Sequence, residues 1–340
     1  MSDGAVLADR YDALLLDLDG TIVLAGQPIP HAAEVLRRLR DGGPRSMVVT
    51  NNASRSPEAV AGHLAELGID IDPADVIGSP LAAAGMLAKT HRRGDAVLVV
   101  GAQALADAVA AAGLRPVRRA DNRPVAVVQG YDPDTSWRDL AEACIALRTG
   151  ADWVATNTDV TLPTDRGLLP GNGAMVQALV TATGAHPRVA GKPARPLLDL
   201  AVERAGVARP LVVGDRLETD IAAAVAAGMP SLMVLTGVST PADLLAAPVD
   251  RRPTAVAVDL RGLVDSTMVA ILDDAGHGDG WKVTASDDGL ELFSAGGRTP
   301  ISALGALTAR AWATGTTKVR AGDADAAASL SELGLSTGTE

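Results

Sequence analysis

The segment LLLDLDGT, residues 14–21, ends an apolar run with two carboxylates, Asp17 and Asp19. Successive side chains of a β-strand alternate between its two faces, so both carboxylates would project to the same side. Such a pair could divide the work of nucleophile and proton donor. The same residues also fit a β-hairpin, because Asp19-Gly20 is a strong type I′ turn signal between two apolar runs. Taken alone, the segment favours neither interpretation.

Polar residues follow two further apolar runs. RSMVVT ends in Thr50 and is followed by Asn51 and Asn52, whose hydroxyl and backbone amides suit phosphate oxygens. For Asn52, a plain polar loop before a helix is the alternative. PLVVG is followed by Asp215, and Asp220 comes five residues later. A helix cap would explain Asp220, but it would leave Asp215 unexplained.

Lys192 lies in the sequence AGKP, just before a predicted helix. A lone lysine is far more often a solvated surface group than a functional one. It does not belong to a Walker A loop, because Pro193 follows it in place of Ser or Thr. Ligands of open α/β sheets, however, bind beyond the carboxyl ends of the strands. We therefore expect Lys192 to join the polar residues at the strand ends in one crevice.

The chemistry of this set is that of phosphoryl transfer. The clustered carboxylates of Asp17, Asp19 and Asp215 would repel one another, and a divalent cation would relieve the repulsion. Oxygen-only ligands favour Mg²⁺, and the sequence has no Cys or His cluster for zinc. Mg²⁺ and Lys192 would neutralise a phosphoryl group, while one carboxylate attacks phosphorus and its neighbour acts as general acid and then base.

The elements that must position these residues alternate along the chain. Short apolar runs predict strands at residues 14–18, 45–50, 96–100, 125–129, 153–156 and 211–213. Alanine-rich helical patterns lie between them, for example at residues 102–112 and 136–149. Ser56-Pro57 predicts an N-cap and first helical residue. This alternation predicts an α/β fold with parallel sheets.

The pattern changes past about residue 265. Two strand-like runs, 281–285 and 290–294, precede a helical pattern that starts at Pro300. We expect a small α+β domain here. The acidic run at residues 273–280 lacks the glutamate that an EF-hand requires, so it predicts a solvated loop.

Composition limits the classes of function. The chain has 340 residues, 47% of them hydrophobic, which allows two or three domains. Its net charge of -11 offers no electrostatic footprint for nucleic acid. The single cysteine, Cys144, fits a reducing compartment. With no apparent signal sequence or membrane-length apolar stretch, we expect a cytoplasmic protein without membrane insertion, and a homo-oligomer is possible.

Four motifs in this order resemble the haloacid dehalogenase (HAD) superfamily of phosphotransferases. They are DLDGT at 17–21, TNN at 50–52, GKP at 191–193 and GDRLETD at 214–220. The last three have the forms typical of subfamily IIA, the NagD-like and para-nitrophenylphosphatase-like enzymes. The resemblance covers roughly residues 11–260.

The resemblance implies a Rossmann-like hydrolase core with an inserted α/β cap domain of the C2 type. We expect the core at residues 1–79 and 187–265, the cap at 80–186, and an α+β C-terminal extension at 266–340. The interval between Thr50 and Lys192 is far longer than one strand–helix unit needs, which agrees with an insertion.

By the same resemblance, Asp17 is the nucleophile that forms an aspartyl-phosphate, and Asp19 is the general acid and base. Mg²⁺ is bound by Asp17, the backbone carbonyl of Asp19, and Asp215. Asp220 does not bind the metal itself but supports the residues that do.

The resemblance further implies that Thr50 and the amide of Asn51 bind phosphate, with Asn52 in the same loop. Lys192 stabilises both the nucleophile and the phosphate. The segment TNTD at residues 156–159 also resembles this subfamily.

Asn157 and Asp159 are therefore candidates for contact with the substrate. Gly171-Asn172-Gly173 lacks the third glycine of a dinucleotide-binding loop, so a helix-entry turn is expected there.

These features predict a Mg²⁺-dependent phosphatase for a small phosphomonoester. A core followed by an appended domain resembles a member of the subfamily that hydrolyses glycerol 3-phosphate in glycerophospholipid recycling and has an acetyltransferase-like tail. Phosphoglycolate, pyridoxal phosphate and sugar phosphates remain alternative substrates. A phosphorylated signalling receiver is the rival class, although a receiver has no need of Asp19. A working acetyltransferase in the tail is disfavoured, because no glycine-rich pyrophosphate loop is evident there.

Overall fold

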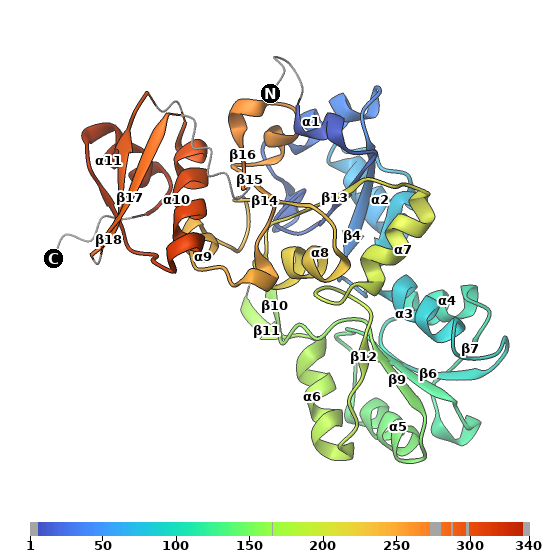
Figure 1. Ribbon diagram of the computed structural model, residues 1–340. Coiled ribbons are helices and arrows are strands. Elements are labelled where there is room, and N and C mark those ends of the chain that lie inside the picture. Colours follow the sequence, from blue (N-terminus) through green and yellow to red (C-terminus); the bar gives the residue numbers. More distant parts are fainter. Residues whose placement is uncertain (1–5, 165, 273–279, 287, 297–298, 336–340) are drawn as a thin grey trace. The chain divides into compact units, whose positions relative to one another are not determined.

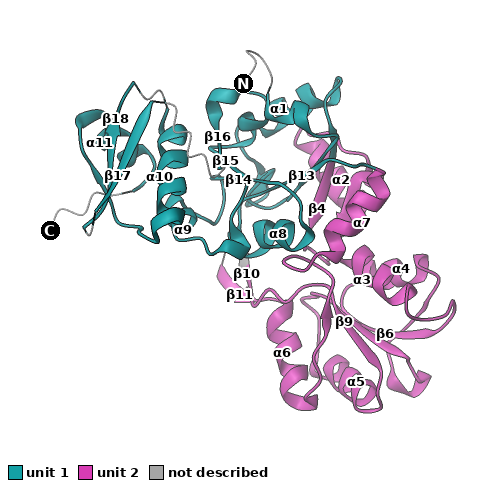
Figure 2. Ribbon diagram, in the orientation of Figure 1, with its two compact units in different colours: residues 1–46, 207–340 teal, residues 47–206 magenta. Residues whose placement is uncertain are grey.

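The computed structural model describes residues 6–164, 166–272, 280–286, 288–296 and 299–335. The chain divides into two compact units (Figure 2): unit 1 comprises residues 1–46 and 207–340, and unit 2 comprises residues 47–206. The predicted core, cap and extension have different limits from these units and stay a prediction. The acidic run predicted to be a loop lies, but for Gly280, outside the described residues.

The sheet of unit 1 is parallel, apart from an antiparallel edge strand (Figure 1). Its strands, in spatial order, are β16 (Val269–Ile271), β15 (Ala255–Ala257), β14 (Ser231–Val234), β13 (Pro210–Gly214) and β1 (Ala13–Leu16). All four residues of β1 are buried, as its continuous apolar run predicts for a strand covered on both faces. Beside it, the N–H of Arg45 donates to the carbonyl of Asp12.

Short helices connect these strands. They are α1 (Ala32–Arg40), the π-helical turn η4 (Leu217–Ile221), α8 (Ala222–Ala227) and α9 (Pro241–Leu245), with 3-10 turns at Leu7–Arg10, Val249–Arg251, Leu260–Leu263 and Ser266–Met268. Asp220, considered above as a helix cap, lies inside η4 instead, and its Oδ2 accepts the N–H of Arg216 at 3.2 Å.

The hairpin turn considered for Asp19-Gly20 lies further along the chain. The paired strands are β2 (Val23–Leu24) and β3 (Gln27–Pro28), and Ala25-Gly26 connects them with positive φ at both positions. Two left-handed residues are what a type I′ turn requires. Asp19-Gly20 is therefore available for another purpose.

The end of unit 1 combines a small mixed sheet with two helices, in agreement with the predicted α+β extension. Its strands are β17 (Trp281–Ser286), β18 (Gly289–Ser294) and β19 (Val319–Ala321). Helix α10 (Pro300–Thr314) lies between β18 and β19 in the chain, and α11 (Ala324–Glu332) follows β19. The first pair is antiparallel and the second is parallel. Leu304 and Leu307 of α10 share one buried cluster with Leu244 and Val256 of the larger sheet region. The extension therefore packs into the same core as the rest of unit 1.

Unit 2 contains two groups of parallel strands. β4 (Arg45–Thr50) enters it and pairs with β5 (Val76–Gly78). The second sheet has the order β12 (Arg188–Val189), β9 (Asp152–Ala155), β8 (Ala126–Gln129), β6 (Ala96–Val100) and β7 (Arg115–Val117). Its other elements are α2 (Pro57–Glu66), α3 (Ser79–Ala88), α4 (Gln103–Ala111), α5 (Trp137–Arg148), the hairpin β10 (Thr161–Thr164) and β11 (Gly167–Pro170), α6 (Asn172–Thr183) and α7 (Pro196–Ala205), with 3-10 turns at Pro73–Asp75 and Ala120–Asn122.

Local sequence explains where several of these elements begin. Ser56 caps α2, as predicted, because its hydroxyl accepts the N–H of Ala59 at 3.3 Å and Pro57 occupies the first turn. α5 and α6 bury small and aliphatic side chains in one cluster with Trp153 of the sheet. The predicted α/β architecture is thus confirmed.

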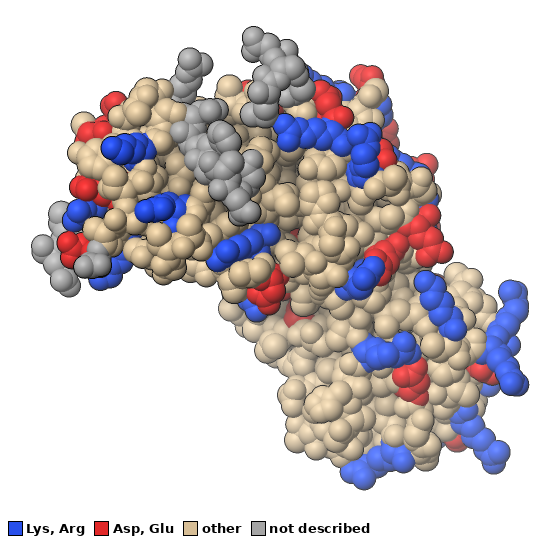
Figure 3. All heavy atoms as spheres, viewed as in Figure 1, with Lys and Arg blue, Asp and Glu red and all other residues tan. Residues whose placement is uncertain are grey.

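The surface carries charges of both signs. On the face shown in Figure 3, Lys and Arg side chains are interspersed with Asp and Glu between wide areas of other residues. Every helix in the described part of the chain is too short or too polar to cross a lipid bilayer.

We expect Leu304→Ala to lower the free energy of unfolding by about 2–5 kcal/mol, because this fully buried side chain would leave a cavity in the shared core. Urea denaturation followed by circular dichroism measures the change. Leu168→Ala is the control, because Leu168 is 70% exposed and its loss should cost less than about 0.5 kcal/mol. Equal effects of the two substitutions would contradict a core that includes α10.

Candidate active site

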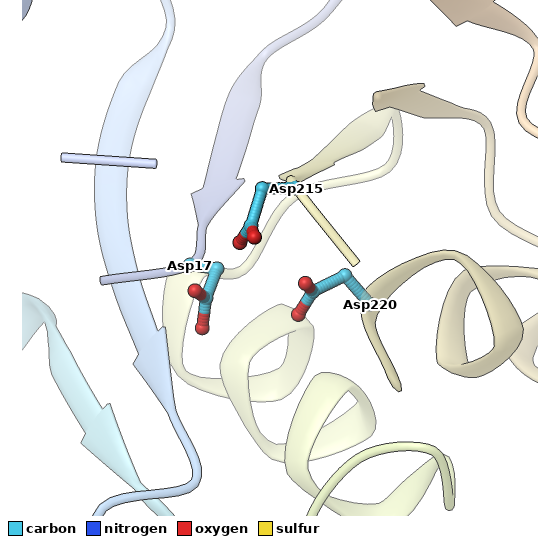
Figure 4. A group of neighbouring side chains, drawn as sticks. All are labelled: Asp17, Asp215 and Asp220. Atoms are coloured by element: carbon cyan, nitrogen blue, oxygen red, sulfur yellow. The ribbon is translucent and has the colours of Figure 1, made fainter. Parts of the chain in front are cut away.

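Three carboxylates of unit 1 lie together. Asp17 follows β1, Asp215 follows β13, and Asp220 belongs to η4; each offers an oxygen within 4.8 Å of the others (Figure 4). Parallel pairing of β1 with β13 brings the first two to one edge of the sheet, and the N–H of Asp17 donates to the carbonyl of Val213 at 2.8 Å. Asp215 and Asp220 are only 1% and 2% exposed. Of the predicted cluster of Asp17, Asp19 and Asp215, the structure brings Asp17 and Asp215 together and adds Asp220.

Two glycines make this approach possible. Gly20 has a φ of +94°, and a Cβ on it would lie 2.5 Å from Cγ of Asp215. A Cβ on Gly214 would overlap the side chain of Asp220. Larger residues at these two positions would therefore separate the acids.

The segment after β14 also holds Asp215. The N–H of Val238 donates to Asp215 Oδ2 at 2.7 Å, and the N–H of Ser239 donates to the Asp215 carbonyl at 3.1 Å. A Cβ on Gly237 would overlap the same carboxylate. The sequence analysis missed this segment, although TGVST follows an apolar run just as the other site residues do.

This donor set fits a hard divalent cation. Carboxylate oxygens brought within 4.8 Å of one another repel unless a cation or protons lie between them, and oxygen-only sites select Mg²⁺ or Ca²⁺. Asp17 and Asp215 were predicted as ligands, whereas Asp220, predicted to support them, offers an oxygen equally near. The side chain of Asp19 is exposed and lies outside this group. Its predicted contribution through the backbone carbonyl stays a prediction.

In unit 2, Asn51 forms hydrogen bonds with three other predicted site residues. Its Nδ2 donates to the Lys192 carbonyl at 2.9 Å and to Asp159 Oδ2 at 3.3 Å, and its Oδ1 accepts the Lys192 N–H at 2.8 Å. Asn157 Nδ2 donates to the Asn51 carbonyl at 2.9 Å. A Cβ on Gly191 would overlap Asn51 Oδ1, which explains the glycine of GKP.

Lys192 is not a solvated surface residue. It is 3% exposed, and its Nζ donates to the carbonyl of Val49, on the strand that ends at Thr50, at 2.9 Å. Thr50 is likewise 3% exposed. Burial of an ammonium group is costly unless partners compensate it, and the Val49 carbonyl is one such partner. The catalytic role of Lys192 stays a prediction.

Asn52 is engaged in its own turn. Its Oδ1 accepts the N–H and the hydroxyl of Ser54 at 2.9 and 2.8 Å, and its N–H donates to Thr50 Oγ1 at 3.0 Å. These bonds favour the interpretation of Asn52 as a loop residue. Its role in phosphate binding stays a prediction.

Comparison with known proteins decides the family. The model of the haloacid dehalogenase-like hydrolases matches residues 14–115, and a HAD-hydrolase-like model matches residues 189–263. The D-glycerol 3-phosphate phosphatase of Mycobacterium tuberculosis is 51% identical over 291 residues, which are 85% of this chain and 80% of that protein. The chain belongs to the haloacid dehalogenase-like hydrolases.

Solved structures of this hydrolase family agree. A glycerol phosphate phosphatase of M. tuberculosis in complex with magnesium has a TM-score of 0.91 at 46% identity, over 97% of this chain and 99% of that one. The 4-nitrophenylphosphatase of Thermotoga maritima has a TM-score of 0.70 at 32% identity, over 76% and 98%. A model of the GCN5-related N-acetyltransferase-like domain matches residues 278–335. The predicted family and class, a Mg²⁺-dependent phosphatase, are confirmed.

An ion pair fixes the strand that leads to Lys192 in this hydrolase. Arg188 of β12 donates to Asp152 Oδ2 at the start of β9, and His91 Nε2 lies 3.3 Å from the same oxygen. Burial alone would raise the pKa of the Asp152 carboxyl, but the hydrogen bond and charge of Arg188 outweigh it. The pKa of Asp152 is therefore lowered below the ordinary value of an aspartate.

A lowered pKa in the folded state means that ionised Asp152 stabilises the fold at neutral pH, and that this contribution is lost as pH falls through the folded-state pKa. We expect Asp152→Asn to destabilise the protein at pH 7 and to flatten the acid limb of its stability below about pH 4. Thermal unfolding between pH 3 and pH 7 measures both effects. Asp121→Asn is the control, because Asp121 pairs with Arg119 at the exposed surface. An acid limb of wild-type steepness in Asp152→Asn would contradict this assignment.

Proposed function

We propose that this hydrolase removes phosphate from glycerol 3-phosphate. The observation that carries the proposal is the extent of the similarity to the M. tuberculosis enzyme, which covers 97% of the chain and so includes the C-terminal extension. The 5'-nucleotidase of Bacillus subtilis matches 67% of the chain at 37% identity, and the acid sugar phosphatase of Staphylococcus aureus matches 69%. Nucleotides and sugar phosphates are therefore the second candidates, with phosphoglycolate and pyridoxal phosphate.

The proposed reaction begins at Asp17. Its carboxylate attacks phosphorus, and the bond from phosphorus to the glycerol oxygen breaks while Asp19 donates a proton to that oxygen. Asp19, now a carboxylate, then removes a proton from water, and the hydroxide displaces Asp17 from phosphorus. Phosphate leaves, and both aspartates return to their starting states.

Three acids are proposed to hold Mg²⁺, namely Asp17, Asp215 and Asp220, with the carbonyl of Asp19. Their hard oxygen atoms and mutual repulsion support the assignment. Bound there, Mg²⁺ would supply positive charge for the phosphoryl oxygens.

The buried residues of unit 2 are proposed to bind the phosphate. The hydroxyl of Thr50 and the amide of Asn51 would donate to its oxygens, and Lys192 would neutralise its charge. Asn51, held on both sides by the backbone of Lys192, would keep these donors in place. Asn157 and Asp159 lie on the same network and are proposed to orient the substrate.

Two rival activities predict results that differ from those of a phosphatase. A receiver would be phosphorylated on Asp17 but would not sustain turnover, and an acetyltransferase activity of the extension would require acyl-CoA binding. The fold of the tail alone does not indicate that activity. Cytoplasmic location and a homo-oligomer stay predictions.

We expect Asp17→Asn to reduce phosphate release by about 10⁴-fold or more while the circular dichroism spectrum stays unchanged, because the nucleophile is lost and its volume is kept. The assay is steady-state release of phosphate from para-nitrophenyl phosphate with Mg²⁺. Wild-type turnover in this variant would remove Asp17 from the mechanism.

Asp19→Asn should depend on the leaving group. Hydrolysis of glycerol 3-phosphate should slow far more than that of para-nitrophenyl phosphate, since only the poor alkoxide leaving group needs a proton. Rates for a series of phosphomonoesters whose leaving groups differ in pKa measure this. Equal losses across the series would contradict the role of Asp19 as general acid.

The substrate is tested by ranking phosphomonoesters by kcat/KM. Glycerol 3-phosphate should exceed nucleoside monophosphates, phosphoglycolate, pyridoxal phosphate and sugar phosphates by about tenfold or more, if its hydroxyl groups are recognised by hydrogen bonds. A higher kcat/KM for another ester would replace glycerol 3-phosphate and leave the phosphatase assignment intact.

A further inference from the structure

Residues 236–239, here called the β14 loop, bond to Asp215 and to the two turns beside the acidic site, one after β1 and one at η4. Besides its two bonds to Asp215, the Thr236 hydroxyl donates to the carbonyl of Gly20 at 2.6 Å. Ser239 Oγ accepts the N–H of Leu217, the first residue of η4, at 3.0 Å. One short loop therefore holds both the segment after β1 and the turn that carries Asp220.

The β14 loop continues directly into α9. Thr240 is the N-cap of that helix, and its hydroxyl accepts the N–H of Asp243 at 3.2 Å. Near the other end, the carbonyl of Leu244 accepts the indole Nε1–H of Trp312, from α10 of the C-terminal extension, at 2.9 Å. The helix between loop and indole has only five residues, so a shift at one end moves the other.

Trp312 is itself fixed on both sides. Its ring packs against the buried cluster that contains Leu244 and Leu304. The guanidinium of Arg252 lies 4.8 Å from the ring centroid, and Arg252 Nε donates to the Ala247 carbonyl at 3.1 Å. The Arg252 guanidinium over the indole face, together with the packing of the ring, holds the Trp312 Nε1–H against the Leu244 carbonyl, so Trp312 anchors the end of α9.

We propose that Trp312 is a positioning residue for the metal site and that the C-terminal extension acts on that site through α9 and the β14 loop. The three carboxylates lie within 4.8 Å of one another, and the N–H groups of Val238 and Ser239 hold Asp215 in this arrangement. Through Trp312, α10 holds α9, and α9 in turn holds the β14 loop that precedes it. The inference rests on the proposed role of Asp215 as a ligand of Mg²⁺. Groups that orient metal ligands contribute to metal affinity without touching the metal.

The test compares two tryptophans of the extension in the full-length protein. Trp312→Phe removes the donor to Leu244 and keeps an aromatic ring beneath Arg252. Trp281→Phe is the matched control, because Trp281 Nε1 donates at 3.1 Å to Ser302 of α10, within the extension, and packs against the same cluster. Binding of Mn²⁺ is measured by electron paramagnetic resonance without substrate, and Mg²⁺ is titrated as competitor. Thermal unfolding without metal is recorded for each variant.

We expect Trp312→Phe to raise the Kd for Mg²⁺ by about two- to fivefold and Trp281→Phe to leave it unchanged, although both lower the Tm. Ser239→Ala, which removes the acceptor for Leu217, should raise the Kd by about three- to tenfold. In the phosphatase assay, the Mg²⁺ concentration for half-maximal activity should rise in parallel, with KM unchanged at saturating Mg²⁺.

A wild-type Kd in Trp312→Phe, or an equal rise in Trp281→Phe, would overturn the inference, because the effect would then be absent or merely one of stability. Asp215→Asn separates this failure from failure of the proposed site. If Asp215→Asn loses metal binding while Trp312→Phe does not change it, only the positioning role is wrong. If Asp215→Asn binds Mg²⁺ as the wild type does, the metal assignment is wrong and the inference fails with it.

Discussion

Mutual repulsion of three carboxylates is the constraint on which the structure of unit 1 depends. Asp17, Asp215 and Asp220 bring oxygens within 4.8 Å of one another, two of them almost fully buried. Such a group is stable only if backbone donors, a cation or protons compensate it. The features around it follow from this need: glycines where the acids approach, amide donors aimed at Asp215, and an oxygen-only donor set suited to Mg²⁺.

The groups that hold the three carboxylates in place include residues well outside the sequence motifs. The β14 loop supplies the donors, α9 continues the loop, and α10 of the C-terminal extension anchors α9 through Trp312. The extension shares one buried cluster with the larger sheet, so its packing is part of the folding of unit 1. The extension matches an acetyltransferase-like family model at residues 278–335, but a fold alone does not imply acyl-CoA chemistry.

Unit 2 contains a buried cation, the ammonium group of Lys192, whose burial must also be compensated. Lys192 lies almost fully buried with its ammonium group on the carbonyl of Val49, and the side chain of Asn51 bonds to its backbone on both sides. Asn157 and Asp159 bond to the same asparagine. Asn51 thus links Lys192 to Asp159 through its side chain and to Asn157 through its backbone carbonyl, so the residues proposed to bind phosphate and substrate share one hydrogen-bond network.

The sequence alone predicted where the strands lie to within one or two residues, the order of the motifs and the family, because apolar runs and the polar residues that follow them are local features. The runs at 45–50 and 96–100 match β4 and β6 residue for residue. Only the tertiary structure showed that the I′ turn lies at Ala25-Gly26, that Asp220 stands among the acids, and that Lys192 is buried. It also showed that the β14 loop bonds to Asp215 and that the Trp312 indole donates to the Leu244 carbonyl of α9. These features arise from contacts between residues far apart in the chain, and neither propensity nor spacing encodes which distant backbone groups will meet a given side chain.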